Sequence, residues 1–228
     1  HLFFTHYHSD HMMDYARLVH AAWDEGGAPI KVFGPAPLAK INDGYFGADG
    51  VLQNDLRART ELTQSQQVWV ARGGTLPRPW PTPEITEIEP GFTFEGNGWS
   101  LGSCQATHAQ PILECLAFSV EHDGKKFVYS GDTGINKQVT ALCRNADFLL
   151  HWCYRGSDET AHPALMAMSP DPGEVARIAE GTGVKRLYLT HFRIHMDKET
   201  GHAKAKADLK NNFGGPSGIV EDLDSYDI

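Results

Sequence analysis

The chain of 228 residues contains no run of about 18 or more apolar residues, and this excludes a membrane-spanning helix within it. No basic-then-apolar leader opens it, and no repeat or low-complexity segment is found. Basic residues are also scarce, with 20 Lys and Arg against 29 Asp and Glu, a formal net charge of −9. Because phosphate backbones are bound by basic surfaces, this balance disfavours a nucleic-acid partner. We expect neither a membrane nor a nucleic acid as partner.

Cysteine is sparse as well. The four cysteines, Cys104, Cys115, Cys143 and Cys153, form no CxxC pair and lie in apolar or strand-like segments. They are expected to be buried thiols. Bridges between Cys104 and Cys115 or between Cys143 and Cys153 remain open in an oxidising compartment. A cytoplasmic location is favoured, and a periplasmic one stays open.

With 41% hydrophobic and 21% charged residues, the chain is long enough to bury a sizeable core, and residues 1–228 are expected to form one domain. Apolar runs predict strands at 2–4, 31–33, 84–89, 100–107, 116–122, 126–130, 148–150 and 187–189. Asp123 and Gly124 predict a hairpin turn. Helices are predicted at 12–23 and 137–145. A third helix is predicted to run to about residue 180, with Ser169 as its N-cap and Pro170 at its first helical position.

The alternation of strands and helices, with some hairpins, predicts an α/β (α+β) fold in which two sheets pack face to face and are covered by helices. Residues 38–67 are partly helical in pattern, and the Pro-rich stretch that follows cannot be helix. We expect residues 38–83 to form a lid insertion over a pocket.

Histidine, in contrast, is abundant. Of the 12 histidines, four lie within the first eleven residues, and His6, His8, Asp10 and His11 form an HxHxDH pattern directly after an apolar run. In a turn after a strand, His6 and His8 point to one side, and Asp10 and His11 reach a second position beyond them. Imidazole and carboxylate ligands suit zinc, manganese or iron. Two such cations side by side can bind both the attacking and the leaving oxygen of a displacement reaction.

Three further strand ends carry a potential ligand: His108 after Thr107, Asp132 after Gly131, and His191 after Thr190. Each alone is more often a structural histidine or a turn residue. Together with the opening cluster they predict a metal site, because His and Asp at the ends of so many separate strands have no common structural explanation.

This pattern resembles the metallo-β-lactamase superfamily, whose αββα sandwich holds its metals at the sheet ends. The resemblance implies one or two zinc-type ions, with His6, His8 and His108 on the first, Asp10, His11 and His191 on the second, and Asp132 bridging. It further implies that a metal-bound hydroxide attacks the substrate and that Asp10 also orients this nucleophile.

Branches of the superfamily differ at a few positions. The bridging Asp132 argues against β-lactamases, and His8 argues against flavodiiron oxidoreductases, which carry Glu there. Element order is closest to the ribonuclease Z-like branch. However, Met168-Ser169-Pro170 stands where ribonuclease Z has a His-Ser-Thr motif that assists the leaving group, and no Gly-rich tRNA arm is found.

The expected function is therefore a zinc-dependent hydrolase acting on a small, apolar or aromatic organic substrate, with a layout similar to the hydrolytic dehalogenase of chlorothalonil. A ribonuclease Z-like phosphodiesterase is the first alternative, and a non-catalytic, metal-containing binding module is the second. The ligands do not distinguish ester, thioester, lactone, phosphoester or carbon–halogen cleavage.

Some residues carry two interpretations each. His151 follows the apolar run 148–150, and is either a catalytic proton donor or extra ligand, or a core imidazole. Arg155 either holds an anion or forms a surface salt bridge. Six aromatic residues either line the substrate pocket or belong to the core: Trp23, Tyr45, Phe46, Trp69, Trp80 and Trp152. Three histidines in polar segments are expected to be solvated or at an interface: His162, His195 and His202.

The chain begins one strand before its metal motif, whereas the superfamily has several strands before that point. If those N-terminal strands are missing, the first sheet has an exposed edge that a partner chain or a retained cleaved segment must cover. We therefore expect a homodimer.

Overall fold

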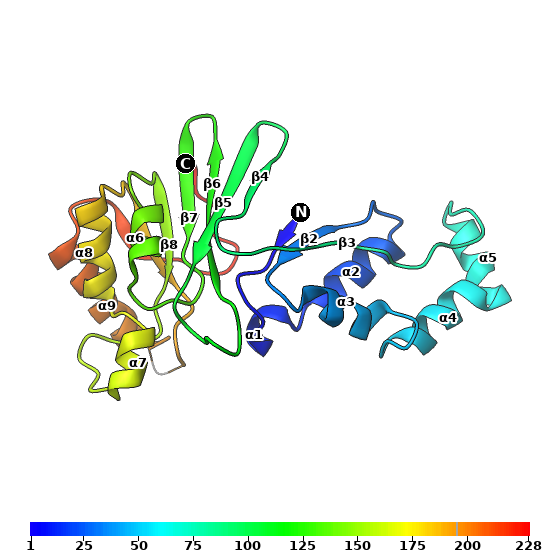
Figure 1. Cartoon of the computed structure of the whole chain (residues 1–228), viewed down its shortest axis with the longest axis horizontal. Helices are drawn as coiled ribbons and strands as arrows, with labels where there is room; N and C mark the ends of the chain where they lie inside the picture. Colours follow the sequence, from blue (N-terminus) through cyan, green and yellow to red (C-terminus); the bar gives the residue numbers. More distant parts are fainter. Residues whose placement is uncertain (195) are drawn as a thin grey trace. The chain divides into compact units, whose positions relative to one another are not determined.

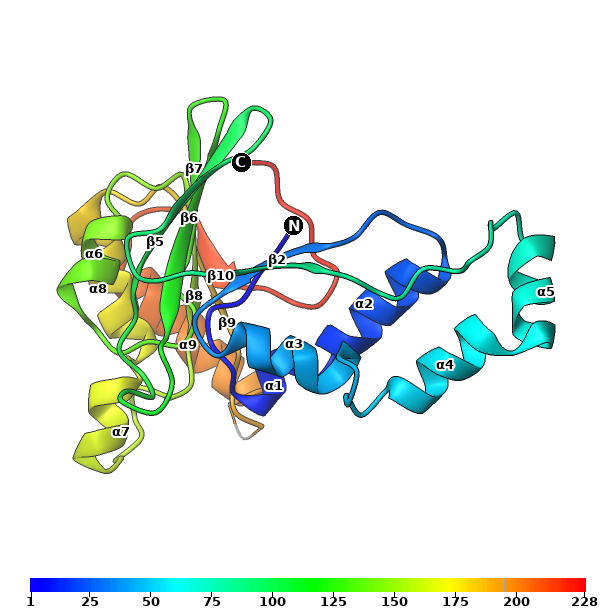
Figure 2. The same ribbon diagram turned by 45° about the vertical axis from the view of Figure 1, so that its right-hand side comes forward.

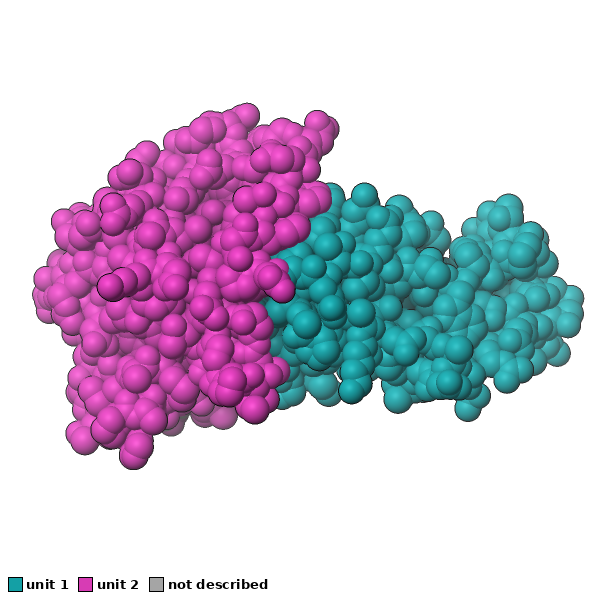
Figure 3. All heavy atoms as spheres, viewed as in Figure 1, with its two compact units in different colours: residues 1–88 teal, residues 89–228 magenta. Residues whose placement is uncertain are grey.

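The computed structural model describes residues 1–194 and 196–228, which separate into two compact units, His1–Ile88 and Glu89–Ile228 (Figure 3). The division falls between the third and fourth strands along the chain, and the single domain expected from the sequence stays a prediction. Each unit contains one β-sheet. The two predicted sheets are therefore confirmed, one in each unit.

Unit 1 is built on a small parallel sheet in the order β1-β2-β3 (Figure 1). Its strands are β1 (Leu2–Phe3), β2 (Lys31–Gly34) and β3 (Glu84–Glu87). Its helices are α1 (Ser9–Met12), α2 (Tyr15–Asp24), α3 (Leu38–Phe46), α4 (Gln53–Glu61) and α5 (Thr63–Ala71). Within the described residues, β3 lies at one edge of this sheet and β1 at the other.

The first long helix differs from the predicted one. The pattern predicts a helix from residue 12, but residues 9–12 form the separate short helix α1, and α2 begins only at Tyr15. Tyr15 packs edge-on against Phe4 and Phe46, with ring centroids 5.5 and 6.1 Å apart. Because this buried contact fixes Tyr15 as the first residue of α2, the residues of the preceding motif form a separate short helix.

The predicted lid segment contains α3, α4, α5 and the Pro-rich connection. Within unit 1, α4 and α5 lie at the end away from β1 (Figures 1 and 2). Asp24 ties this end together, because its carboxylate pairs with Arg59, Arg72 and Arg78 at 3.3, 3.2 and 2.7 Å. Whether the segment covers a site stays a prediction.

Unit 2 is built on a seven-stranded sheet in the order β10-β9-β8-β7-β6-β5-β4. Its strands are β4 (Thr93–Glu95), β5 (Trp99–Gln105), β6 (Leu116–His122), β7 (Lys125–Tyr129), β8 (Phe148–Trp152), β9 (Leu187–Thr190) and β10 (Ser217–Ile219). Its helices are α6 (Lys137–Leu142), α7 (Pro163–Met168), α8 (Pro172–Thr182) and α9 (Glu199–Asn212). The strands β7 to β10 run parallel, whereas β4 to β7 pair antiparallel.

The core of unit 2 lies between this sheet and α6, α8 and α9, which cover one face of it (Figure 2). Fully buried side chains come from both layers: Val128, Leu149, Leu187 and Leu189 from the strands, and Val175, Ala176, Ala179 and Leu209 from the helices. Burial of this continuous apolar surface is the main stabilising contribution to the unit.

Of the local sequence patterns, the turn was predicted correctly and one helix start was not. Asp123 and Gly124 form the predicted turn, with φ of 48° and 72°. The predicted helix start at Ser169 is wrong, because Asp171 caps α8 and Glu174 completes a capping box with Pro172 at the first helical position. Ser169 instead ends α7. The elements α7, α9, β4 and β10 were not predicted.

All four cysteines are free, so neither of the two bridges left open by the sequence is formed. Cys115, Cys143 and Cys153 are buried as predicted, and Cys104 is half-buried. Burial raises the pKa of the Cys143 thiol to about 12. In the described part of the chain, no helix has both the length and the apolar character that crossing a membrane requires.

Candidate metal centre

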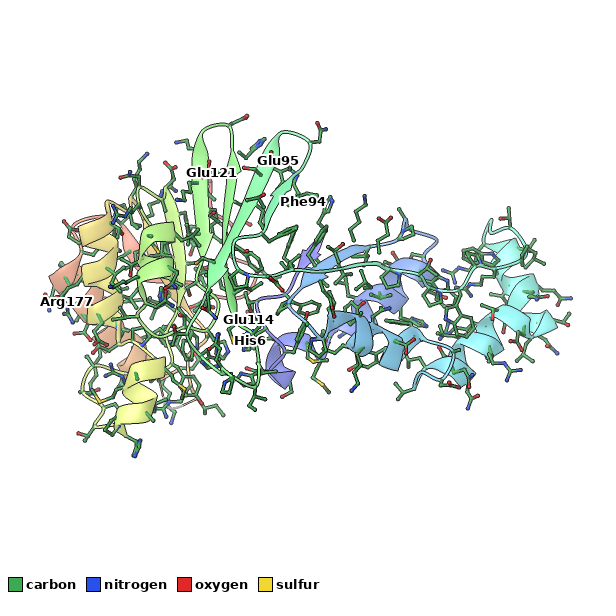
Figure 4. The ribbon with its side chains drawn as sticks, viewed as in Figure 1. His6, Phe94, Glu95, Glu114, Glu121 and Arg177 are labelled. Carbon is green, nitrogen blue, oxygen red and sulfur yellow. The ribbon has the colours of Figure 1, made fainter. Side chains whose placement is uncertain are left out.

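The first group of predicted ligands lies in unit 1, directly after β1, where His6 is labelled in Figure 4. His6 Nε2 lies 3.1 Å from His8 Nδ1, and Thr5 Oγ1 lies 3.1 Å from the other ring nitrogen of His6. The His11 ring lies 4.2 Å from the His6 ring, centroid to centroid, and His11 Nε2 lies 3.5 Å from Asp10 Oδ2. The HxHxDH motif thus gathers its four donor side chains at one place.

The second group lies in unit 2 and follows from strand direction. The strands β7, β8 and β9 are parallel, and β5 runs in the same direction because two antiparallel pairings separate it from β7. The carboxyl ends of these strands therefore meet at one edge of the sheet. His108 follows β5, Asp132 follows β7, and His191 follows β9.

Asp132 is the centre of this second group. Its Oδ2 lies 3.7 Å from His108 Nε2 and 3.5 Å from His191 Nε2. The backbone is in the left-handed region at Gly131, directly before Asp132, and at His191 itself, with φ of 56° and 62°. A histidine there is uncommon, and such strain concentrates at functional sites because the surrounding structure must hold it.

Hydrogen bonds join the loops that carry His108 and Asp132. The Thr107 N–H donates to Thr133 Oγ1 at 3.0 Å, and the Gly134 N–H donates to the Thr107 carbonyl at 2.8 Å. The Asn136 amide donates to both threonine hydroxyls at 3.2 Å. Gly134 has no room for a side chain, because an added Cβ would lie 2.0 Å from the Ala167 carbonyl oxygen. The spacing of the two ligands is therefore set by a fixed backbone.

The donor sets fit a transition-metal ion. Two ligand atoms about 2.1 Å from one tetrahedral ion are about 3.4 Å apart, close to the separations of 3.1 to 3.7 Å within the two groups. Neutral imidazole and carboxylate are also the donors that zinc, manganese and iron accept. Within each unit, the donor atoms therefore have the spacing and the chemistry that such an ion accepts.

His151 has a different environment. It lies in β8 next to Leu189 of β9, and because strand side chains alternate, it shares the face of Leu149, which belongs to the helix-covered core. Its Nδ1–H donates to the Trp152 carbonyl at 2.7 Å, and burial lowers its pKa to about 4. This environment favours the core-imidazole interpretation, and a direct part in the chemistry stays a prediction.

The residue that sequence reasoning valued too little is Trp152. It is the last residue of β8 and stands edge-on to His108 and His191, at centroid distances of 5.1 and 6.1 Å. Tyr154 also packs on it, at 5.6 Å. The signal was its position at the same strand end as the ligands, which was overlooked because the residue cannot bind a metal itself.

The other aromatic residues of the predicted pocket have structural contacts in unit 1. The Trp23 and Trp69 rings enclose the Arg78 guanidinium at 3.9 and 4.4 Å. The indole N–H groups donate to main-chain carbonyls, Trp23 to Pro79, Trp69 to Thr75 and Trp80 to Phe46. Tyr45 and Phe46 pack against Tyr15. These contacts agree with the alternative that the side chains hold unit 1 together.

Arg155 does not form the surface salt bridge expected from the sequence. It is 3% exposed, and its guanidinium donates to Glu174 at 2.7 Å and lies 3.4 Å from Asp171. Of the polar-segment histidines, His162 caps α7, and His202 lies in helix α9, where its ring pairs with Asp197 at 2.9 Å, rather than in a loop. His195 lies outside the described residues.

The sequence pattern of the Beta-lactamase superfamily domain matches residues 1–192 of the chain. The chain belongs to this superfamily. The resemblance predicted from the ligand pattern is thereby confirmed, and the protein is a hydrolase of the metallo-β-lactamase superfamily.

Among curated relatives, the chain is 26% identical over 235 residues to ribonuclease Z of Mycobacterium marinum, covering 98% of this chain and 78% of the relative. It is 25% identical over 197 residues to ribonuclease Z of Mycobacterium bovis, covering 82% of this chain. The match spans 65% of the length of the M. bovis protein, just under two thirds.

Solved structures confirm the fold. The metallo-β-lactamase fold protein YhfI from Bacillus subtilis superposes with a TM-score of 0.66 at 18% identity, over 96% of this chain and 73% of YhfI. Zn²⁺-bound PqqB from Methylobacterium extorquens gives a TM-score of 0.63 at 14% identity, over 99% of this chain and 72% of PqqB.

Proposed function

We propose that this superfamily member is a metal-dependent hydrolase of a small organic substrate, with a dinuclear metal site. In this proposal His6, His8 and His108 hold one zinc-type ion, and Asp10, His11 and His191 hold the other. Asp132 bridges the two. The observation that supports it best is the Asp132 carboxylate, whose Oδ2 has two imidazole nitrogens within 3.7 Å, one from His108 and one from His191.

The cations would lower the pKa of a bound water molecule and stabilise negative charge that develops on the substrate. The protein supplies the positioning. The rigid loops after β5 and β7 hold His108 and Asp132, and the Thr5 contact to Nδ1 of His6 directs its Nε2 toward the site. In this proposal Asp10, which is exposed, would also orient the attacking water.

The choice of a small organic substrate is supported by the region around Ser169. Met168, Ser169 and Pro170 carry no side chain that titrates near pH 7, and Ser169 is fully buried at the end of α7. No proton donor for a leaving group is available at these three positions. Tyr154, half-buried beside His191 at 6.3 Å, offers apolar surface for an organic ligand.

Metal analysis of the purified protein, before and after chelation, tests the metal requirement. We expect one or two equivalents of zinc, manganese or iron, loss of activity on chelation, and recovery when the metal is restored. A protein that neither contains nor takes up a transition metal would overturn the proposal. A panel of chromogenic esters, lactones, haloaromatics and phosphodiesters then identifies the bond that is cleaved.

The matched variants for this experiment are His108→Ala and His122→Ala. His108 is a proposed ligand, whereas the His122 side chain is 63% exposed on the β6–β7 turn. The first substitution should abolish hydrolysis and lower the metal content, and the second should change neither. Equal activity of both variants would exclude His108 from the site.

Phosphodiester hydrolysis is the second candidate, because curated relatives that match nearly the whole chain are named ribonuclease Z. Hydrolysis of bis-p-nitrophenyl phosphate faster than of any ester or lactone in the panel would favour it. Cleavage of a tRNA precursor would extend it to RNA, although the net charge of −9 opposes tight binding of a polyanion.

A further inference from the structure

Trp152 stands where the three strand ends that carry the ligands of unit 2 meet. Its main-chain N–H donates to Ser130 Oγ at 2.9 Å, two residues before Asp132. The next residue, Cys153, donates its N–H to the Thr190 carbonyl at 2.9 Å, directly before His191. The backbone around Trp152 is thus bonded to the segments that deliver both residues.

The indole ring makes a second set of contacts, with the ligands themselves. It meets the His108 ring at an interplanar angle of 78° and the His191 ring at 73°. These edge-on arrangements are the favourable geometry for aromatic pairs. The two imidazoles next to the Asp132 carboxylate therefore share one aromatic neighbour, and Tyr154 packs against that neighbour and against His191.

A third observation separates Trp152 from an ordinary core tryptophan. Its side chain is 2% exposed, yet Nε1 has no hydrogen-bond partner in the described residues. The N–H groups of Trp23, Trp69 and Trp80 all donate to carbonyl oxygens. An unsatisfied buried donor costs free energy, so a smaller apolar residue at this position would be the better choice if stability alone mattered.

We propose that Trp152 is a positioning residue of the metal centre: its ring fixes the orientation of the His108 and His191 imidazoles toward Asp132. The inference rests on the proposed metal-dependent function. It assigns Trp152 no contact with substrate or metal. Its contribution is to the ligand geometry, which a metal ion requires within a few tenths of an ångström.

The experiment compares Zn²⁺ affinity in Trp152→Ala and Trp152→Phe, measured by competition with a chromophoric chelator. Loss of an outer contact to a metal ligand weakens binding by about 10- to 100-fold, and we expect this for the alanine variant. Phenylalanine keeps an aromatic ring against both imidazoles and should restore affinity to within about threefold of the wild type. Trp152→Leu, which has apolar volume but no ring, replaces the alanine variant if that variant does not fold.

Two readouts separate positioning from general stability. Co²⁺ bound to the alanine or leucine variant should give a visible absorption spectrum that differs from the wild-type spectrum, because the ligand geometry differs. The melting temperature of the metal-free variants gives the structural effect alone. Trp99→Ala, which removes a half-buried tryptophan from β5, serves as the control and should leave Zn²⁺ affinity unchanged.

The outcomes are distinguishable. Wild-type Zn²⁺ affinity and an unchanged Co²⁺ spectrum in the variants without a ring would overturn the positioning role and leave the metal-dependent function intact. Equal weakening by phenylalanine and leucine would also overturn it, because the ring would then be irrelevant. A wild-type protein that binds no metal would overturn both.

Discussion

The Oδ2 atom of Asp132 lies 3.5 Å from Nε2 of His191, although the two residues are 59 positions apart in the chain. His108 approaches the same oxygen from another loop, at 3.7 Å. A buried carboxylate that faces two imidazoles is either an ion pair or the shared ligand of a metal site, and the superfamily assignment favours the second.

Asp132→Asn should therefore remove the bridging ligand. We expect a loss of at least about 100-fold in kcat/KM, and fewer bound metal equivalents, because an amide is a weaker ligand than a carboxylate. Steady-state kinetics and elemental analysis measure the two effects. Asp123→Asn, at the exposed turn between β6 and β7, is the matched control and should leave both unchanged. Full activity of Asp132→Asn would remove Asp132 from the site.

The low pKa of His151 gives a prediction about pH. In the folded protein burial lowers this pKa to about 4, whereas the unfolded chain has the ordinary value of 6.5. Between these values the unfolded state binds a proton that the folded state does not, so the contribution of His151 to stability is present above about pH 6.5 and is lost as pH falls toward 4.

Urea denaturation at pH 7, 6 and 5 measures this contribution. The wild type should lose roughly 1 kcal/mol per pH unit more than His151→Asn over this window, because asparagine can keep the bond to the Trp152 carbonyl but does not titrate. Parallel loss of stability in both proteins would contradict the assignment. Retained hydrolysis by His151→Asn would further show that His151 is not the proton donor.

Arg155 is predicted to be structural. Because its buried guanidinium contacts Ser169, Glu174 and Asp171, Arg155→Met leaves two partly buried carboxylates without their cation. We expect a loss of about 3 to 5 kcal/mol in the free energy of unfolding, measured by chemical denaturation. Arg177→Met, on the exposed face of α8 (Figure 4), should change it by no more than about 0.5 kcal/mol. Similar effects of the two substitutions would refute the structural role.

The contacts of Arg78 predict how α4 and α5 are retained within unit 1. Its guanidinium is enclosed by Trp23 and Trp69 and bonds to Asp24 at 2.7 Å. Arg78→Met should release this end of the unit, so that amide hydrogen exchange rises in residues 53–74 and stays unchanged in unit 2.

Arg57→Met provides the control for that measurement, since Arg57 forms only an exposed pair with Glu61 on α4. Its exchange pattern should match the wild type. If Arg78→Met also shows wild-type exchange across residues 53–74, the cation–π contacts are not what holds α4 and α5.

The positions of the proposed ligands at strand ends were predictable from the sequence because each depends on a local pattern. An apolar run that ends in His or Asp places that side chain at a strand end, and this was correct for His108, Asp132 and His191. The turn at Asp123 and Gly124 was equally local, since few residue pairs adopt two consecutive positive φ angles without strain. The capping box of α8 is local too, because Asp171 and Glu174 are three residues apart in the chain.

Only the tertiary structure decided the surroundings of those ligands. That Trp152 lies against His108 and His191, that Arg155 is buried, and that Trp23 and Trp69 enclose Arg78 all depend on contacts between segments far apart in the chain. Local residue preferences determine where a side chain leaves the backbone. What it meets depends on strand order and packing, and these emerge only when the whole sheet is assembled.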